Sequence, residues 1–170
     1  MNQSALAIDN QSVWGVEDEL SVLTFSLNGE TFAIEAIVVQ EILDLLPETH
    51  VPGSKSFVPS VINFRGKVIP LADIRLAFGM DVNEATIDSR IIVIELDLGG
   101  ESTLIGIRTD RVYEVTTLAR TASEPPPSVG MRWRADYIDC LVKRDGEFII
   151  LPNLDAIFAA QGDRKAKSNG

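Results

Sequence analysis

The residues of this chain that could do chemistry are few, and they do not form a recognisable catalytic pattern. The chain has one histidine, His50, in the loop segment PETHVPG. A Ser–His–Asp or Cys–His site would need this histidine together with a nucleophile motif, and nothing in its local pattern resembles one. We therefore interpret His50 as a solvated loop residue and expect no catalytic residue and no enzyme activity.

Motifs for cofactors and metals are also missing from the sequence. No GxGxxG or GxxxxGK[ST] pattern occurs, and Gly99-Gly100 is typical of a hairpin turn. The acids lack metal-ligand spacing, and the single cysteine, Cys140, allows neither a CxxC site nor an internal disulfide. We expect no cofactor and no metal, and we interpret pairs such as Asp136 and Asp139 as surface acids.

The segment VINFRGKVIPLADIRLAFG, residues 61–79, is the best candidate for a surface that binds another molecule. Strand alternation places Asn63 and Arg65 on the face opposite to the apolar residues. Gly66 permits a tight turn, so Arg65 is expected at a hairpin tip. A carboxylate would hold this arginine rigid, and Glu41 in the strand-like VQEI is our candidate partner.

Short strands separated by turn signals must position this hairpin. Asn28-Gly29 and Asp145-Gly146 are residue pairs that two-residue hairpins prefer. The β-branched run at 91–96 is typical of a strand, and three prolines at 125–127 exclude regular structure there. Many short strands with few helices favour barrels or a sandwich. The expected strands and hairpins occupy residues 21–34, 39–45, 61–71, 91–107, 111–118 and 137–152.

Only short helical segments are predicted. A helical turn is expected at residues 36–39. Asp73 is a suitable N-cap and Gly79 a suitable C-terminal residue for a helix over 74–78. Asn153 is a plausible cap for a short closing helix.

The domain is predicted to cover residues 20–159, with flexible tails at 1–19 and 160–170. Both tails lack periodicity, and chain ends are usually poorly ordered unless they are docked. We therefore expect that removing the tails changes the melting temperature little. Trp14 is the exception within the first tail, and we expect this large side chain to fold back onto the domain.

The charge and hydropathy of the chain exclude several classes of partner. A net charge of −10 repels phosphate backbones, so nucleic-acid binding has no electrostatic basis. No apolar run approaches the ~18 residues of a membrane span, and the N-terminal segment has no basic region followed by an apolar run. We therefore expect a cytoplasmic protein that does not insert into membranes.

Four stretches occur in an order that is typical of one known family. The most specific, residues 63–75, reads N-F-R-G-K-V-I-P-L-A-D-I-R and follows the pattern N-x-R-G-x-x-I/V-P-x-x-D-L/I-R. The others are F-x-L-x-G with F-A-I in 25–34, V-Q-E-I in 39–42, and G-I-x-x-D-x-V-x-x-V in 106–115. Over roughly residues 20–159 the chain thereby resembles CheW, the coupling-protein family of bacterial chemotaxis.

The resemblance implies a fold, a function and partners. Such proteins are mostly β, with two small SH3-like β-barrel subdomains packed around a shared hydrophobic core and a few short helices. They are non-catalytic adapters without a cofactor. They couple the cytoplasmic tip of a methyl-accepting chemoreceptor to the regulatory domain of a CheA-type histidine kinase, at receptor arrays on the inner membrane.

The resemblance also implies candidate contact residues. The Asn63–Gly66 hairpin and the Val39–Ile42 strand match family regions near the groove for receptor helices and near a kinase contact. Ser60 and Cys140 stand where the family often has glycine, so partner choice has changed if those glycines serve close approach. The candidate receptor or kinase contacts are Val39, Glu41, Ile42, Ser60, Asn63 and Arg65.

Two readings outside chemotaxis stay open at this point. A small barrel with an exposed sheet edge could bind a peptide as an added strand. A barrel of this size could instead hold a small molecule without catalysis. A co-purified kinase would favour the adapter, whereas a bound metabolite would favour the small-molecule barrel.

Overall fold

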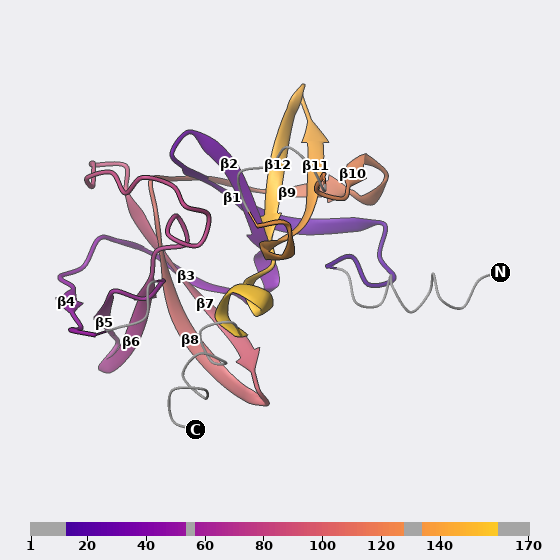
Figure 1. The fold of residues 1–170 in the computed structure, drawn as a ribbon. Helices are drawn as coiled ribbons and strands as arrows, with labels where there is room; N and C mark the ends of the chain where they lie inside the picture. The colour runs from indigo at the N-terminus through magenta and orange to yellow at the C-terminus, as the bar shows by residue number, and fades with distance from the viewer. Residues whose placement is uncertain (1–12, 54–56, 128–133, 160–170) are drawn as a thin grey trace.

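The computed structural model describes residues 13–53, 57–127 and 134–159, which are built almost entirely from short strands (Figure 1). Three 3₁₀ turns, η1 (Ala36–Val38), η2 (Arg120–Ala122) and η3 (Ala135–Tyr137), connect strands, and residues 154–159 are helical. The strands are β1 (Glu19–Leu27), β2 (Glu30–Glu35), β3 (Val39–Asp44), β4 (Thr49–His50), β5 (Ser60–Phe64), β6 (Lys67–Ala72), β7 (Arg90–Leu98), β8 (Glu101–Thr109), β9 (Arg111–Ala119), β10 (Ser123–Glu124), β11 (Ile138–Arg144) and β12 (Glu147–Pro152).

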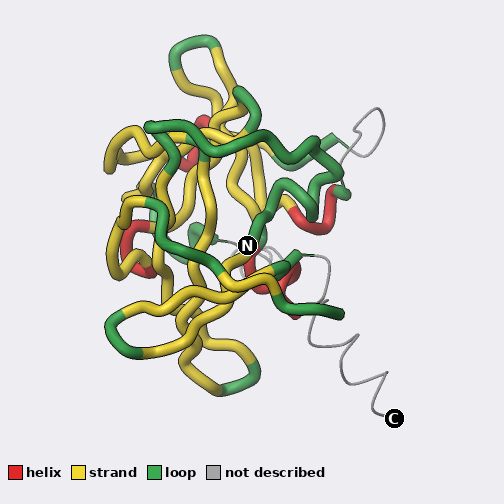
Figure 2. The backbone as a smooth tube through the Cα atoms, turned by 90° about the vertical axis from the view of Figure 1, so that its left-hand side faces the viewer, coloured by secondary structure: helices red, strands yellow, loops and turns green. Residues whose placement is uncertain are grey.

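The strands form two six-stranded sheets that curl into two small SH3-like barrels. The first sheet has the order β10-β11-β12-β2-β1-β9, and the second has the order β3-β7-β8-β6-β5-β4. The chain starts in the first sheet, crosses at η1 to build the second, and returns at Asp110 between β8 and β9. Hairpin turns project from the ends of the strands (Figure 2). The first and the last strand of the chain, β1 and β12, therefore both belong to the first sheet.

Three hydrophobic clusters explain why several strands are apolar on both faces. In β7, Ile91 and Val93 belong to a cluster inside the second barrel, whereas Ile92 and Ile94 belong to the core shared by both barrels. The sequence of a strand that is buried on both faces is a continuous apolar run, without alternation of apolar and polar residues. The expectation of two barrels around a shared core is confirmed. The shared core also contains Phe25, Phe32, Phe78, Ile107, Tyr137 and Ile157.

The local turn signals correspond to the observed turns. Asn28 and Gly29 have φ values of 51° and 82°, and Asp145 and Gly146 have φ values of 53° and 80°. Positive φ at both central residues is the type I′ geometry that matches the twist of the flanking strands. The predicted hairpins at both positions are confirmed, as is the helical turn that begins at Ala36.

The helix predicted over 74–78 is wrong in detail, since residues 74–79 form successive turns. Most of their amide bonds join residues three apart, such as Leu76 N–H to the Asp73 carbonyl (3.1 Å) and Ala77 N–H to the Ile74 carbonyl (3.0 Å). Bonds of this kind do not propagate an α-helix. By contrast, Asn153 caps the closing helix as predicted, because its Oδ1 accepts the Ala156 N–H at 3.0 Å.

The described residues that precede the predicted N-terminal boundary at residue 20 include one that packs into the domain. Trp14 is only 5% exposed and packs with Val22, Leu118 and Cys140 in the core of the first barrel. The expectation that Trp14 folds back is therefore confirmed, and Val13 packs against the same cluster. Residues 1–12 and 160–170 lie outside the described part of the chain, so flexible tails there stay a prediction. Among the described residues, no helix is both long and apolar enough to cross a membrane.

Candidate protein-interaction surface

The turn between β5 and β6 holds an arginine in a conformation that arginine rarely adopts. Arg65 and Gly66 have φ values of 52° and 81°, so both lie in the left-handed region. Asn63 closes the turn, because its Oδ1 accepts the Gly66 N–H at 3.0 Å. A side chain such as arginine costs roughly 1–2 kcal/mol in this region, which Gly avoids and Asn tolerates well. The sequence therefore keeps Arg65 here at the expense of stability.

The Arg65 side chain forms the ion pair that the sequence predicts. Its guanidinium donates to Glu41 Oε1, and it lies 5.1 Å from the centre of the Phe64 ring. The pair joins β3 to the β5–β6 hairpin, although β7 and β8 lie between them in the sheet order. It can form because the second sheet curls back on itself. The arginine side chain is still 71% exposed, so it remains accessible to a partner.

An apolar side chain that no sequence motif singles out completes this surface. Val68 is directly opposite Asn63 in the hairpin register, and it is exposed. We use the name hairpin-tip surface for Glu41, Asn63, Arg65 and Val68. An exposed apolar residue beside a fixed arginine is a composition typical of interface cores.

Strand β3 carries two further candidate contacts, Val39 and Ile42, and Ile42 is the more exposed of the two. Ile42 is 43% exposed on the outer strand of the second sheet. Val39 is partly buried against the shared core. Burying an aspartate at position 39 would therefore disturb the fold, so a Val39→Asp change cannot isolate a binding effect.

Ile42 borders a groove of about 400 Å³ between the two barrels. Val112, which also packs against the shared core, is the second apolar residue of its lining. Arg111 donates to Asp88 Oδ2 at 2.5 Å, and Arg90 donates to the carbonyls of Ile87 and Ser89, both at 2.8 Å. We use the name inter-barrel groove for Ile42, Asp88, Arg90, Arg111 and Val112. Arg90 and Arg111 could not be predicted from the sequence, because only the fold brings them beside β3.

Ser60 was predicted as a partner contact, but it is not on the surface. It is 1% exposed, and its hydroxyl donates to Glu48 Oε1 at 3.2 Å. The alternation of β5 explains this, because Ser60 shares the inward face with Ile62 and Phe64. Cys140 is also buried, and burial raises the pKa of its thiol to about 11.

No metal centre accompanies these surfaces in the described ranges 13–53, 57–127 and 134–159. Within them, no group of three or more His, Cys, Asp or Glu side chains could hold a metal ion. What the arrangement offers is two adjoining recognition surfaces, one at a hairpin tip and one in a groove.

Comparison with known proteins places this chain in a family. The model of the CheW-like domain matches residues 21–162. The chemotaxis protein CheW of Rhizobium meliloti is 26% identical over 140 residues, which cover 82% of this chain and 88% of that protein. The chemotaxis protein CheW of Bacillus subtilis is 27% identical over 146 residues, which cover 85% of this chain and 90% of that protein.

A solved structure shares the fold as well as the sequence pattern. It is the crystal structure of the scaffolding protein TtCheW from Thermoanaerobacter tengcongensis, with a TM-score of 0.72 and 30% sequence identity. The match covers 82% of this chain and 87% of that one. The two-barrel architecture described above is thus shared with that scaffolding protein.

Proposed function

The chain belongs to the CheW-like family, whose members are non-catalytic scaffolds and adapters of chemotaxis, and we propose that it couples a methyl-accepting chemoreceptor to a CheA-type histidine kinase. The receptor would contribute its cytoplasmic tip and the kinase its regulatory domain. The protein would therefore act in the cytoplasm, at receptor arrays on the inner membrane.

The observation that carries this proposal is Arg65. It occupies a left-handed turn position where asparagine or glycine would cost less, and its exposed side chain is held by Glu41. Backbone strain of this kind is retained where the surrounding structure and the function require it. The position also falls in the most specific of the family-like stretches, residues 63–75.

The two surfaces suit two different partners. The inter-barrel groove has apolar residues, Ile42 and Val112, with charged side chains beside them. Such a groove fits the apolar face of a helix, and a chemoreceptor tip is helical. The hairpin-tip surface would then take the kinase, with Arg65 setting its orientation.

The coupling mechanism needs no chemistry in this chain. An adapter that binds both kinase states equally well would not shift the equilibrium between them, however tight the complex. It can raise or lower kinase activity only by binding one state more tightly than the other. A receptor that alters the geometry of the shared complex would thereby alter the kinase equilibrium.

Reconstitution tests the function directly. Kinase autophosphorylation is measured in receptor-containing membranes with and without this protein, and we expect receptor control of the kinase only when the protein is present. If the kinase responds equally well without it, the adapter proposal fails and the small-molecule barrel becomes the better hypothesis.

Single substitutions separate the two surfaces. Ile42→Asp should weaken receptor binding by on the order of 1–3 kcal/mol and leave the circular dichroism spectrum native. Phe148→Asp is the matched control, because Phe148 is 45% exposed but lies on the first sheet. Equal losses in both variants would show that the groove is not the receptor site.

A charge swap tests the hairpin-tip surface. Arg65→Glu and Glu41→Arg should each weaken kinase binding, and the double variant should partly restore it if the pair shapes the contact. If the losses of kinase binding in the two single variants simply add in the double variant, the ion pair does not shape the kinase contact.

A further inference from the structure

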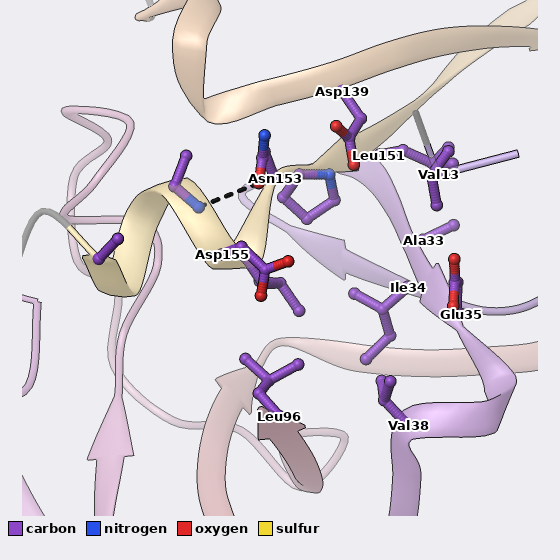
Figure 3. Close-up of a pocket in the computed structure, with 14 residues that line it drawn as sticks. Val13, Ala33, Ile34, Glu35, Val38, Leu96, Asp139, Leu151, Asn153 and Asp155 are labelled. Atoms are coloured by element: carbon purple, nitrogen blue, oxygen red, sulfur yellow. Dashed lines mark hydrogen bonds between the residues drawn. The ribbon is translucent and has the colours of Figure 1, made fainter. Parts of the chain in front are cut away.

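A second pocket lies on the side of the barrel junction next to the closing helix, and neither proposed partner accounts for it. Its volume is about 600 Å³. Strand β2, strand β7 and the helix at 154–159 all contribute to its lining, which is mostly apolar (Figure 3). Ile34, Val38 and Leu96 lie along one side of it (Figure 3).

Three carboxylates from three different elements enter this pocket. Glu35 is on β2, Asp139 is on β11, and Asp155 is on the closing helix (Figure 3). None of the residues that line the pocket within the described chain is Lys, Arg or His. The described residues also provide no ion pair to any of the three. The pocket thus combines a mostly apolar lining with three carboxylates, and its described lining residues supply no positive charge.

The titration behaviour of the carboxyls agrees with this geometry. Burial raises the pKa of Asp139 to about 6, and the neighbouring charges of Asp155 and Glu35 add to the effect. Burial and then the charge of Asp155 also raise the pKa of Glu35. A cation placed among these groups would reverse both shifts.

The chain itself carries suitable cations next to the pocket. Ala159, the last described residue, is part of the lining, and residues 160–170 follow with Arg164, Lys165 and Lys167. The five residues from Ala159 to Arg164 span at most roughly 17 Å, whereas Asp155 is only about 6 Å along the helix from Ala159. Arg164 therefore has ample reach, and Gly162 permits a reversal of the chain.

In place of the flexible C-terminal tail that the sequence predicts, we infer that residues 160–170 dock over this pocket, with Arg164, Lys165 or Lys167 paired to Glu35, Asp139 and Asp155. The segment is tethered at the rim of the pocket, so its effective concentration there is on the order of millimolar. The aliphatic stems of the basic side chains can cover the apolar lining while their charged ends reach the carboxylates. The contact is electrostatic and lies near solvent, so salt weakens it.

The test measures the pKa of the Asp139 carboxyl by NMR in the full chain at low salt. The comparison is the full-length variant Arg164→Gln/Lys165→Gln/Lys167→Gln, in which the segment is kept and its charge is removed. Docking predicts that the pKa of Asp139 is about one unit lower in the native chain than in this variant. The same pKa in both chains would overturn the proposal.

Two further variants exclude other causes. Lys67→Gln/Lys143→Gln removes two positive charges elsewhere on the surface and should leave the pKa of Asp139 unchanged. Residues 1–12 are the competing occupant, since Val13 also lines the pocket. If Leu6→Ser/Ile8→Ser shifts the Asp139 resonance and the triple glutamine variant does not, the N-terminal segment fills the pocket and the proposal is wrong.

Discussion

Single residues in this protein show where local chemistry serves recognition rather than stability. The I′ turns at Asn28-Gly29 and Asp145-Gly146 use residues that accept positive φ, whereas the third turn uses Arg65. Strand alternation and the glycine signal predicted the position of Arg65, and the need for a carboxylate partner suggested Glu41. The same alternation could have predicted that Ser60 is buried, because Ile62 and Phe64 share its face.

The conformational strain at Arg65 can be measured with two substitutions. Arg65→Ala and Arg65→Asn both remove the partly exposed ion pair, which is worth about 0–1 kcal/mol. Asparagine adopts the left-handed region more readily than alanine, so the free energy of unfolding should be higher for Arg65→Asn by about 1 kcal/mol. Urea denaturation gives both values. Equal stabilities would mean that the turn imposes no strain on residue 65.

The raised pKa of Asp139 predicts a pH dependence of stability. The ordinary pKa of an aspartate is 3.8, and burial raises that of Asp139 to about 6 in the folded state. The folded protein therefore favours the protonated carboxyl, so the cost of the charge is absent below about pH 4 and complete above about pH 6. Asp139→Asn should raise the free energy of unfolding at pH 7.5 by on the order of 1–3 kcal/mol, and change it little at pH 4.

The clearest measurement uses the triple glutamine chain, where the proposed tail pairing is absent. Urea denaturation at pH 4 and pH 7.5, with and without Asp139→Asn, gives the four stabilities required. A gain that is equal at both pH values would show that the substitution acts through packing and not through the charge of Asp139.

Elements were predicted well where the signal is local and poorly where it depends on packing. The hairpins follow from turn pairs and β-branched runs, which a single sequence displays. The segment at 74–79 has good capping residues, yet the Asp73 carboxylate also binds the Arg75 guanidinium at 2.7 and 2.8 Å and the chain forms only turns. The large apolar side chain of Trp14 predicted that it folds back, but the segment around it lacks periodicity, so nothing local could show which core receives it.

Trp14 should be a major contributor to the stability of the first barrel. It is buried among Val22, Leu118 and Leu151, and replacing such an aromatic with alanine typically costs 3–5 kcal/mol, on the order of a third or more of a domain's stability. We expect Trp14→Ala to lower the free energy of unfolding by about this amount in urea denaturation. Val16→Ala is the control, because Val16 is exposed in the same segment. If both variants are as stable as the native chain, Trp14 does not complete the core.

At the scale of the whole molecule, a buried ion network ties the two barrels together. Arg75 is 1% exposed, and its guanidinium binds Asp73 at the end of β6 and Asp110 where the chain returns to the first sheet (3.2 Å). Asp110 also accepts the Asn28 N–H at 2.6 Å, from the first hairpin. The sequence showed Asp73, Arg75 and Asp110 as parts of two separate motifs. Their meeting depends on the fold, because 35 residues separate Arg75 from Asp110.

Removing the central charge of this network should loosen the junction between the barrels. Arg75→Met keeps much of the side-chain volume but leaves the buried Asp73 without its partner, which typically costs about 3–5 kcal/mol. Asp110→Asn should cost less, because the Asp110 side chain is partly exposed and Arg75 keeps its bonds to Asp73. Urea denaturation measures both losses. Hydrogen exchange should also show faster opening of the Asn28-Gly29 hairpin in Arg75→Met, because Asp110 loses the cation that holds it beside the Asn28 amide. A variant with native stability and native exchange at this hairpin would mean that apolar packing alone joins the two barrels.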